Sequence, residues 1–370
     1  MDAGAPVSDA ERLATLRLIR SDNVGPITFA ALLGHFGSAP AALDALPELS
    51  KRAGRRVRIA TAGEAERELA AATAFGARLV TLREPGYPPW LRAIDSAPPI
   101  LTLRGDPAVF DRPMVAIVGS RNASAAGRKM AALLARDLGA AGVVIASGLA
   151  RGIDAAAQAA ALATGTVAAF AGGIDRIYPP ENAMLASQIL ASGGGHIAEM
   201  PFGLEPRARD FPRRNRIVSG LSLGVVIVEA AERSGTLITA RFAGEQGRIV
   251  FGVPGSPLDP RAAGTNRLIK EGAILTTHAD DVLAMVEPML HERTAPPVRS
   301  SPPQLPLLAE ADSTGGDHAR VLEALGPSPI EIDEIIRFTG LSVGIVQLAL
   351  IELDLAGRIE RHPGQRVSLA

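Results

Sequence analysis

A series of short apolar runs, alternating with alanine-rich segments, constrains the fold of this chain more than any other feature. Runs of strand length occur at 78–82, 100–105, 114–120, 142–148, 166–173, 196–200, 224–230 and 248–255. Several are apolar throughout, which is typical of strands buried on both faces. Alanine-rich segments with the composition of helices lie between them, at 123–140, 151–163 and 236–246. Strands that alternate with helices predict an α/β fold with a doubly wound, Rossmann-like parallel sheet.

The segments on either side of this region have different patterns. Residues 8–76 contain short helical stretches that predict a small helical domain of the SAM or helix-hairpin-helix kind, which could either contact a DNA backbone or serve only in packing. Residues 291–316 are rich in Pro, Ser and Gly and predict a linker. Residues 317–370 predict short helices followed by a terminal hairpin with His362-Pro363-Gly364 at its tip, the pattern of a winged helix. The predicted Rossmann-like domain therefore spans 77–290.

Composition excludes several classes of protein. The chain has no cysteine, which excludes disulfides and thiolate chemistry, and its 6 histidines have no metal-ligand spacing, so we expect no metal and no cofactor. It shows no signal-peptide pattern and no apolar run of about 18 residues, which predicts a cytoplasmic protein without membrane insertion. The net charge is −1, so nucleic-acid binding would require a local basic patch.

Polar turns follow the predicted strands, at the edge of the sheet where doubly wound folds bind ligands. These turns contain Gly119, Ser120, Arg121, Ser124, Ser147, Gly148, Arg151, Gly152, Gly172 and Gly173. Glycine lets a backbone N–H approach a phosphate, serine adds a donor and arginine binds phosphate bidentately. Each turn alone fits an ordinary helix cap, but together they predict a polyanion site. Among the acids, Asp154 and Asp175 are expected to orient turns, and Glu229 to order the arginines.

The most basic stretch is EPRARDFPRRNRIVSGLS, residues 205–222. A helix that starts near Pro212 would carry Arg213 and Arg216 on one face. This density of arginine suits a nucleic-acid backbone, although internal ion pairs are the alternative for any single arginine. Neither a nucleophile–base pair nor a G-x-S-x-G turn is present, so we do not expect an enzyme.

Several motifs occur in the order found in one known family. YPPWLRAIDSAPPILTLRGD, VAIVGSRNASAAG, IASGLARGIDAAAQ, GGIDRIYPPEN and FPRRNRIVSGLS resemble the DNA-processing protein A family (DprA, also called Smf). VIVEAAERSGTLITARFA, VFGVPGSP and GTNRLIKEGA extend the resemblance to residue 273. The resemblance implies a single-stranded DNA-binding protein that protects incoming DNA and loads the RecA recombinase onto it during natural transformation. It also implies a homodimer formed through the Rossmann-like domain.

The resemblance also implies which residues bind DNA. Arg121 corresponds to the pocket arginine, and the motif positions around it are Ser120, Ser147, Arg151, Arg214 and Arg216. The predicted nucleic-acid-binding set also includes Asn182, Arg213 and Asn215. In one departure, some relatives have a basic residue in or just after the Y-P-x-x-N turn, where this chain has Glu181 and Ala183. The secondary phosphate contact is then either missing or replaced by Arg176.

Two other functions remain open at this level. The sheet also resembles the lysine-decarboxylase-like nucleotide hydrolases, but Ile238 and Thr239 stand near the positions of their acids, and glycosidic cleavage needs a positioned carboxylate. A protein adaptor would instead use the arginines in internal ion pairs. In the winged helix, the predicted third helix at 341–354 has no Lys or Arg, so we expect it to contact protein or regulate the dimer rather than bind DNA.

Overall fold

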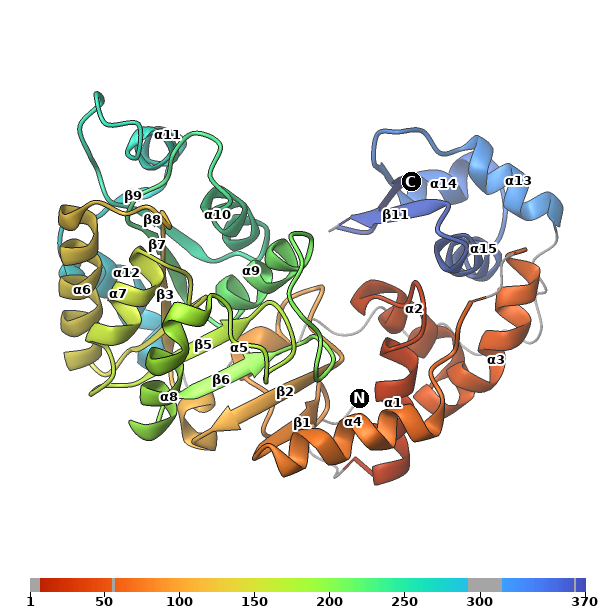
Figure 1. The fold of residues 1–370 in the computed structure, drawn as a ribbon. Helices are drawn as coiled ribbons and strands as arrows, with labels where there is room; N and C mark the ends of the chain where they lie inside the picture. The colour runs from red at the N-terminus through yellow and green to blue at the C-terminus, as the bar shows by residue number, and fades with distance from the viewer. Residues whose placement is uncertain (1–6, 55–56, 292–314, 363) are drawn as a thin grey trace. The chain divides into compact units, whose positions relative to one another are not determined.

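The computed structural model describes residues 7–54, 57–291, 315–362 and 364–370 (Figure 1). The chain forms two compact units. The sheet unit holds Leu69–Ala97 and Leu101–Val298, and the terminal unit holds Met1–Glu68, Pro98–Ile100 and Arg299–Ala370. The predicted linker lies outside the described residues apart from its ends, and the predicted domain boundaries remain predictions. That both ends of the chain form one unit was not predicted from the sequence.

A nine-stranded sheet with the order β1-β2-β6-β5-β4-β3-β7-β8-β9 forms the centre of the sheet unit. The strands are β1 Ala77–Thr81, β2 Ile100–Gly105, β3 Met114–Val118, β4 Val144–Ser147, β5 Thr166–Phe170, β6 Gly195–Ala198, β7 Gly224–Ile227, β8 Ile249–Gly252 and β9 Ile274–Leu275. In this order, neighbouring strands from β6 through β9 are parallel, whereas β2 runs antiparallel to β6. The predicted doubly wound sheet is confirmed, with one antiparallel strand as the difference. Such mixed edges are common in doubly wound folds.

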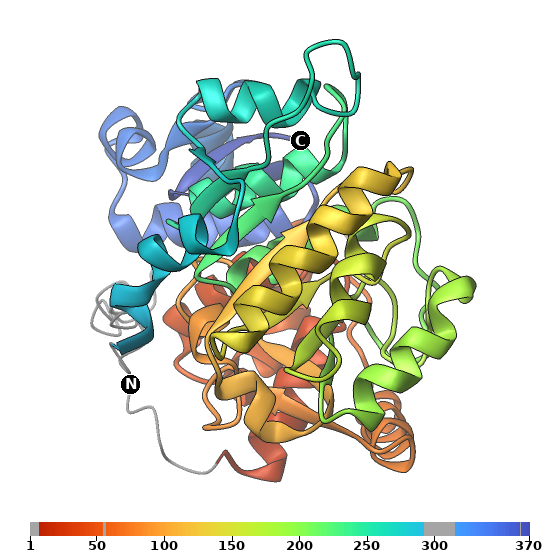
Figure 2. The same ribbon diagram turned by 90° about the vertical axis from the view of Figure 1, so that its left-hand side faces the viewer.

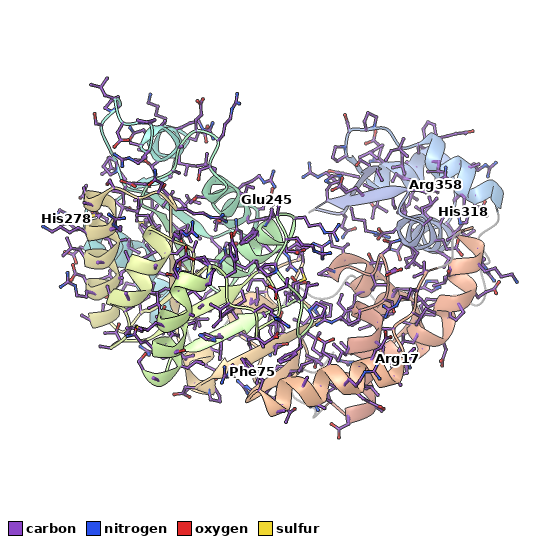
Figure 3. All side chains as sticks on the ribbon, in the orientation of Figure 1. Arg17, Phe75, Glu245, His278, His318 and Arg358 are labelled. Atoms are coloured by element: carbon purple, nitrogen blue, oxygen red, sulfur yellow. The ribbon has the colours of Figure 1, made fainter. Side chains whose placement is uncertain are left out.

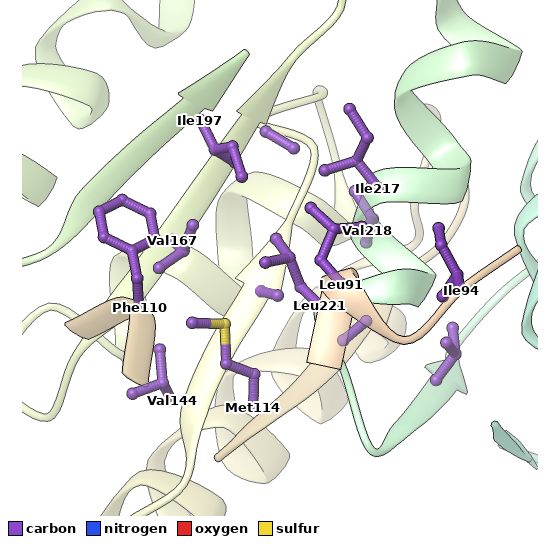
Figure 4. Close-up of a cluster of buried hydrophobic side chains, with 14 of the residues drawn as sticks. Leu91, Ile94, Phe110, Met114, Val144, Val167, Ile197, Ile217, Val218 and Leu221 are labelled. Carbon is purple, nitrogen blue, oxygen red and sulfur yellow. The ribbon is translucent and has the colours of Figure 1, made fainter. Parts of the chain in front are cut away.

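Helices cover both faces of this sheet. They are α5 Pro89–Arg92, α6 Ala125–Ala140, α7 Ile153–Ala160, α8 Ala183–Ala191, α9 Asp210–Gly220, α10 Thr236–Glu245, α11 Ala263–Lys270 and α12 Ala279–His291. Figure 2 shows α6 and α7 side by side on one face. Alternate residues of β3 separate two cores: Val115 and Ile117 pack with α6, α7 and α12, whereas Met114 packs with α5 and α9 (Figure 4). Burial on both faces is why the strands are apolar throughout.

The terminal unit contains helices from both ends of the chain. They are α1 Asp9–Ile19, α2 Pro26–Phe36 and α3 Ala39–Arg52, followed by α4 Ala62–Ala74, which crosses the boundary between the units, and later by α13 Gly315–Glu323, α14 Ile332–Thr339 and α15 Val343–Leu355. A small sheet of β10 Ile330–Glu331, β12 Arg366–Leu369 and β11 Ile359–His362 completes the predicted winged helix. Pro363, at the tip of its hairpin, lies outside the described residues.

Within the described part of the chain, no single helix is long and apolar enough to cross a membrane, although the sharply bent pairs α2–α3 and α14–α15 reach that length and composition together. The described residues contain no group of three or more His, Cys, Asp or Glu side chains that could hold a metal ion.

Candidate nucleic-acid interface

A pocket of about 340 Å³ lies where several loops of the sheet unit meet. Its lining residues follow β3, β4 and β5 or belong to the first turns of α9: Arg121, Asn122, Gly148, Ala150, Arg151, Tyr178, Pro179, Phe211 and Arg214. Arg121, Gly148, Arg151 and Arg214 were among the residues predicted from the sequence. The carboxyl ends of neighbouring parallel strands therefore bring segments that are distant in the chain to one site.

Arg214 is a buried cation at this pocket, with a relative exposure of only 6%. Its Nη1 donates to the carbonyl oxygens of Gly148 and, at 3.1 Å, of Ala169. Burial lowers the pKa of Arg214, and the nearby Asp154 carboxylate opposes this effect. A Cβ on Gly148 would lie 1.7 Å from Arg214 Nη1, so only glycine fits beside the guanidinium. The glycine therefore makes room for the arginine.

Arg121 differs from Arg214 because it is exposed to solvent. Its guanidinium carbon lies 5.0 Å from the centre of the Phe211 ring, a distance at which a cation is attracted to the ring face. No carboxylate of the described chain forms an ion pair with Arg121. Its hydrogen-bond donors are therefore available to an anionic ligand.

Two aromatic rings complete the pocket. The ring centres of Tyr178 and Phe211 are 5.5 Å apart in an edge-to-face arrangement, and Tyr178 is 46% exposed. Neither residue was predicted from the sequence, although Tyr178 lies in IYPPEN and Phe211 in FPRRNR, both within motifs of the family resemblance. Exposed rings beside arginines can stack on nucleotide bases.

Arg151 has a partner within the chain. It forms an ion pair with Glu181, and both side chains are about half exposed, at 59% and 50%. Exposed pairs of this kind contribute little to stability. A phosphate could therefore replace the Glu181 carboxylate at low cost.

Several predicted residues use their polar groups inside the protein. Ser147 is fully buried and its hydroxyl donates to Ile117 O at 2.7 Å. Ser124 accepts from Gly127 N at the start of α6, and Asn182 donates to Leu149 O at 2.8 Å. These three side chains therefore position the loops around the pocket rather than line it.

The predicted glycines also serve contacts within the chain. Gly152 has a φ of +77°, and a Cβ there would lie 2.3 Å from Ser120 O. The Gly173 N–H donates to Leu204 O at 2.9 Å. Gly119 and Gly172 pack closely against Ile153 and Leu204, respectively. Apart from Gly148, these glycines are not part of the pocket lining.

Helix α9 begins at Asp210, slightly before the predicted start near Pro212, and contains both Arg213 and Arg216, three residues apart. Arg213 is exposed whereas Arg216 is buried, so the two arginines do not form a common exposed surface. Arg216 forms an ion pair with Glu199, so the internal ion-pair alternative applies to this arginine. Asn215, between them, donates to Gly235 O at 3.4 Å.

The acidic residues follow the predictions only in part. Asp154 accepts from the backbone N–H of Gly148 at 3.1 Å and so orients that turn, as expected. Asp175 likewise accepts from Gly203 N at 2.7 Å. Glu229, however, binds the backbone N–H and hydroxyl of Ser124, at 3.0 and 2.5 Å, and not an arginine.

Arg176, the predicted alternative to the basic residue that some relatives have, has partners within the chain. It forms ion pairs with Asp175, at 3.0 Å, and with Glu205, at 2.9 Å. Two carboxylates therefore already neutralise this side chain.

Sequence comparisons cover the length of the chain. Residues 78–287 match the family described as DNA recombination-mediator protein A, residues 9–71 match the DprA-like N-terminal HHH domain and residues 301–365 match the DprA winged helix domain. Protein Smf of Escherichia coli is 40% identical over 287 residues, which are 76% of this chain and 75% of the relative. DNA processing protein DprA of Bacillus subtilis is 42% identical over 219 residues, covering 58% and 73%.

Solved structures agree with this assignment. DNA processing protein A from Streptococcus pneumoniae is 32% identical with a TM-score of 0.58, over 76% of this chain and 94% of that chain. The protein from Helicobacter pylori, whose structure was described for its single-stranded DNA binding mode, is 29% identical with a TM-score of 0.53, over 58% and 97%. The chain therefore belongs to the DNA recombination-mediator protein A family.

Proposed function

We propose that this chain binds single-stranded DNA in the pocket formed by Arg121, Arg151, Arg214, Tyr178 and Phe211. The observation that carries this proposal is the exposed Arg121 guanidinium, which has no carboxylate partner among the residues that the structure describes and lies 5.0 Å from the Phe211 ring centre. Arginine binds phosphate through several parallel hydrogen bonds, and an adjacent ring offers a surface to a base. The single-stranded DNA binding mode of the Helicobacter pylori relative supports this assignment.

The pocket favours a single strand over a duplex. Bases in a duplex are stacked and paired, so they cannot reach the Tyr178 and Phe211 rings, whereas a single strand can turn a base toward them. Every base has a π-face and every nucleotide has a phosphate, so binding of this kind is largely independent of sequence. Low aromatic content across the chain does not weaken the proposal, because two rings at one site are enough to stack a base.

Further cations extend the positive surface beyond the pocket. Arg209 and Arg213 are exposed at the start of α9 and form no ion pair within the described chain. Each arginine that neutralises a phosphate releases counterions, so affinity is expected to fall steeply with salt. The remaining predicted contacts, from Ser120 and Asn215, belong to the same proposal.

We also infer that the bound strand is passed to the RecA recombinase during natural transformation, by a dimer formed through the Rossmann-like domain. The description of the family as a recombination mediator supports this role. The role requires binding without chemistry, and it would place the protein in the cytoplasm.

A titration of the full chain with labelled oligonucleotides tests the DNA site. Single-stranded DNA should bind more tightly than a duplex of the same length at two salt concentrations, and Arg121→Ala should weaken binding about tenfold. Arg136→Ala is the matched control, because Arg136 is an exposed arginine near the far end of α6. Equal affinity of Arg121→Ala and the unsubstituted chain would reject the pocket.

A second assay tests the transfer step. RecA assembly on single-stranded DNA that is already coated with a single-strand binding protein should accelerate when this chain is added, and Arg121→Ala should remove the effect. An unchanged rate of RecA assembly would reject transfer without affecting the DNA-binding proposal.

A further inference from the structure

The third helix of the winged helix, α15, packs against two cores at once. Val346, Ala349, Leu350 and Leu353 belong to the core of the winged helix itself. Leu348, Ile351 and Leu355 belong to a different core, which they share with α2 and α3 of the N-terminal helical bundle. Figure 1 shows α15 beside these helices within the terminal unit. A helix that is apolar on all sides is buried on all sides.

Polar contacts fix the register of this packing. Thr28 in α2 donates its hydroxyl to Asp354 Oδ2 at 2.8 Å. Asn23, just before α2, donates its side-chain amide to Leu355 O at 2.7 Å. Asp354 also forms an ion pair with Arg361 of the wing at 3.0 Å. Thr28, Asp354 and Arg361 thus link the N-terminal bundle, α15 and the wing in one continuous network.

Both acids of α15 have partners within the terminal unit. Its two acids are Glu352, which is fully buried and pairs with His318 (labelled in Figure 3), and Asp354. The helix has no Lys or Arg to offer to a base edge or a phosphate. A DNA-reading helix needs an accessible polar face, and α15 has its central residues buried on both sides.

We propose that α15 is a docking helix whose partner is the N-terminal helical bundle of the same chain, and that this docking closes the helix to DNA. The winged helix then serves to join the two ends of the chain rather than to bind nucleic acid. The inference concerns the terminal unit only and does not depend on the proposed DNA pocket in the sheet unit.

Cysteine cross-linking tests the docking directly, because the natural chain contains no cysteine. In the full chain, Thr28→Cys combined with Asp354→Cys places two thiols where the native side chains touch. The matched control is Thr28→Cys with Val343→Cys, since Val343 is exposed and lies about 16 Å away from Asp354 along the helix axis. A short thiol-specific cross-linker should give an internally linked monomer in the first pair and little product in the control.

Three results would overturn the proposal. One is a yield no higher than that of the control pair, and another is a cross-link between two chains, which would make the docking intermolecular. The third is a loss of duplex DNA affinity on cross-linking: closure predicts a change within about twofold, whereas a helix that opens to bind DNA predicts a loss of about tenfold or more.

Hydrogen exchange on the unsubstituted chain provides a check that needs no folded variant. If α15 docks on the bundle, the amides of α2 and α15 should lose protection together as denaturant rises, as members of one cooperative unit. Loss of protection in α2 while α15 stays fully protected would show that the winged helix folds independently, and would also reject the proposal.

Discussion

Helices α9 and α15 both occupy places where a protein of this kind could contact DNA, yet their surroundings are opposite. α9 leaves Arg213 exposed and directs the buried Arg214 to a pocket. α15 has no cation and packs apolar residues against two cores. Position in a fold therefore does not decide whether a helix binds DNA. What decides it is whether charged donors stay available after the helix has packed.

The chain offers a convenient way to compare the two regions. Trp90 is its one tryptophan and lies in the sheet unit, so its fluorescence follows the unfolding of that unit. Far-ultraviolet circular dichroism follows helices in both units. A substitution near α9 should shift the fluorescence transition, whereas a substitution in α15 should shift only the dichroism transition.

The largest effect is expected from Arg214→Ala. Its removal leaves the carbonyls of Gly148 and Ala169 without this donor and Asp154 buried without a neighbouring cation. We expect the free energy of unfolding of the sheet unit to fall by about 3–5 kcal/mol, the usual cost of breaking a buried charge network. Denaturant unfolding followed by Trp90 fluorescence measures the loss.

Arg213→Ala is the control for this variant, since Arg213 is the exposed neighbour in the same helix. It should change the stability by less than about 0.5 kcal/mol. If Arg214→Ala were as stable as this control, Arg214 would not be a structural part of the pocket.

Leu355→Ala should have the next largest effect, in the other unit. Leu355 is fully buried in the core that α15 shares with the N-terminal bundle. Truncating a buried leucine costs about 3 kcal/mol because of lost burial and the cavity that remains. The dichroism transition should shift while the Trp90 transition and the single-stranded DNA affinity stay unchanged. A tenfold loss of that affinity would contradict the separation of the two regions.

Most strands of the sheet could be predicted from the sequence, but the burial of individual arginines in α9 could not. The apolar runs predicted β1 to β8 because strands buried on both faces leave a plain signal. β9, Ile274–Leu275, is too short for any periodicity, and an apolar run carries no information on the direction of β2. The arginines of α9 were recognised as a group, but their spacing in the chain does not show which of them the neighbouring elements cover. Arg213 is exposed, whereas Arg214 and Arg216 are buried.

Two further features could not be obtained from sequence patterns. Tyr178 and Phe211 meet only because the segment after β5 and the start of α9 approach each other in the fold. For α15, the absence of cations predicted a role other than DNA binding, but apolar residues show only that a surface is buried. They do not show that the partner is α2 and α3, at the opposite end of the chain.

Lowering the pH should destabilise the sheet unit through His196, a buried residue of β6. Burial lowers its pKa from 6.5 to about 4, although the hydrogen bond to Ala186 O opposes this. Between these values the unfolded chain binds a proton that the folded chain does not, so stability falls as pH falls. From pH 7 to pH 5 we expect a loss of about 2 kcal/mol. In the His196→Gln variant, the unfolding transition followed by Trp90 fluorescence should not show this loss of stability between pH 7 and pH 5. An identical pH dependence in the variant and the unsubstituted chain would show that His196 is not its cause.

The smallest effect is expected from Arg358→Ala, which removes an exposed cation at the start of the wing (Figure 3). Arg361, its neighbour in the wing, already forms an ion pair with Asp354, whereas Arg358 is exposed. A single exposed cation outside a binding pocket attracts DNA only through screened electrostatics. Single-stranded DNA affinity should therefore fall less than about twofold, or about 0.4 kcal/mol, and only at low salt. The measurement is the same oligonucleotide titration that tests Arg121→Ala.

If Arg358→Ala weakened binding as much as Arg121→Ala does, the winged helix would have to reach the DNA through its wing. The difference in DNA binding would then hold for helices α9 and α15 themselves, but not for the Rossmann-like domain and the winged helix to which they belong.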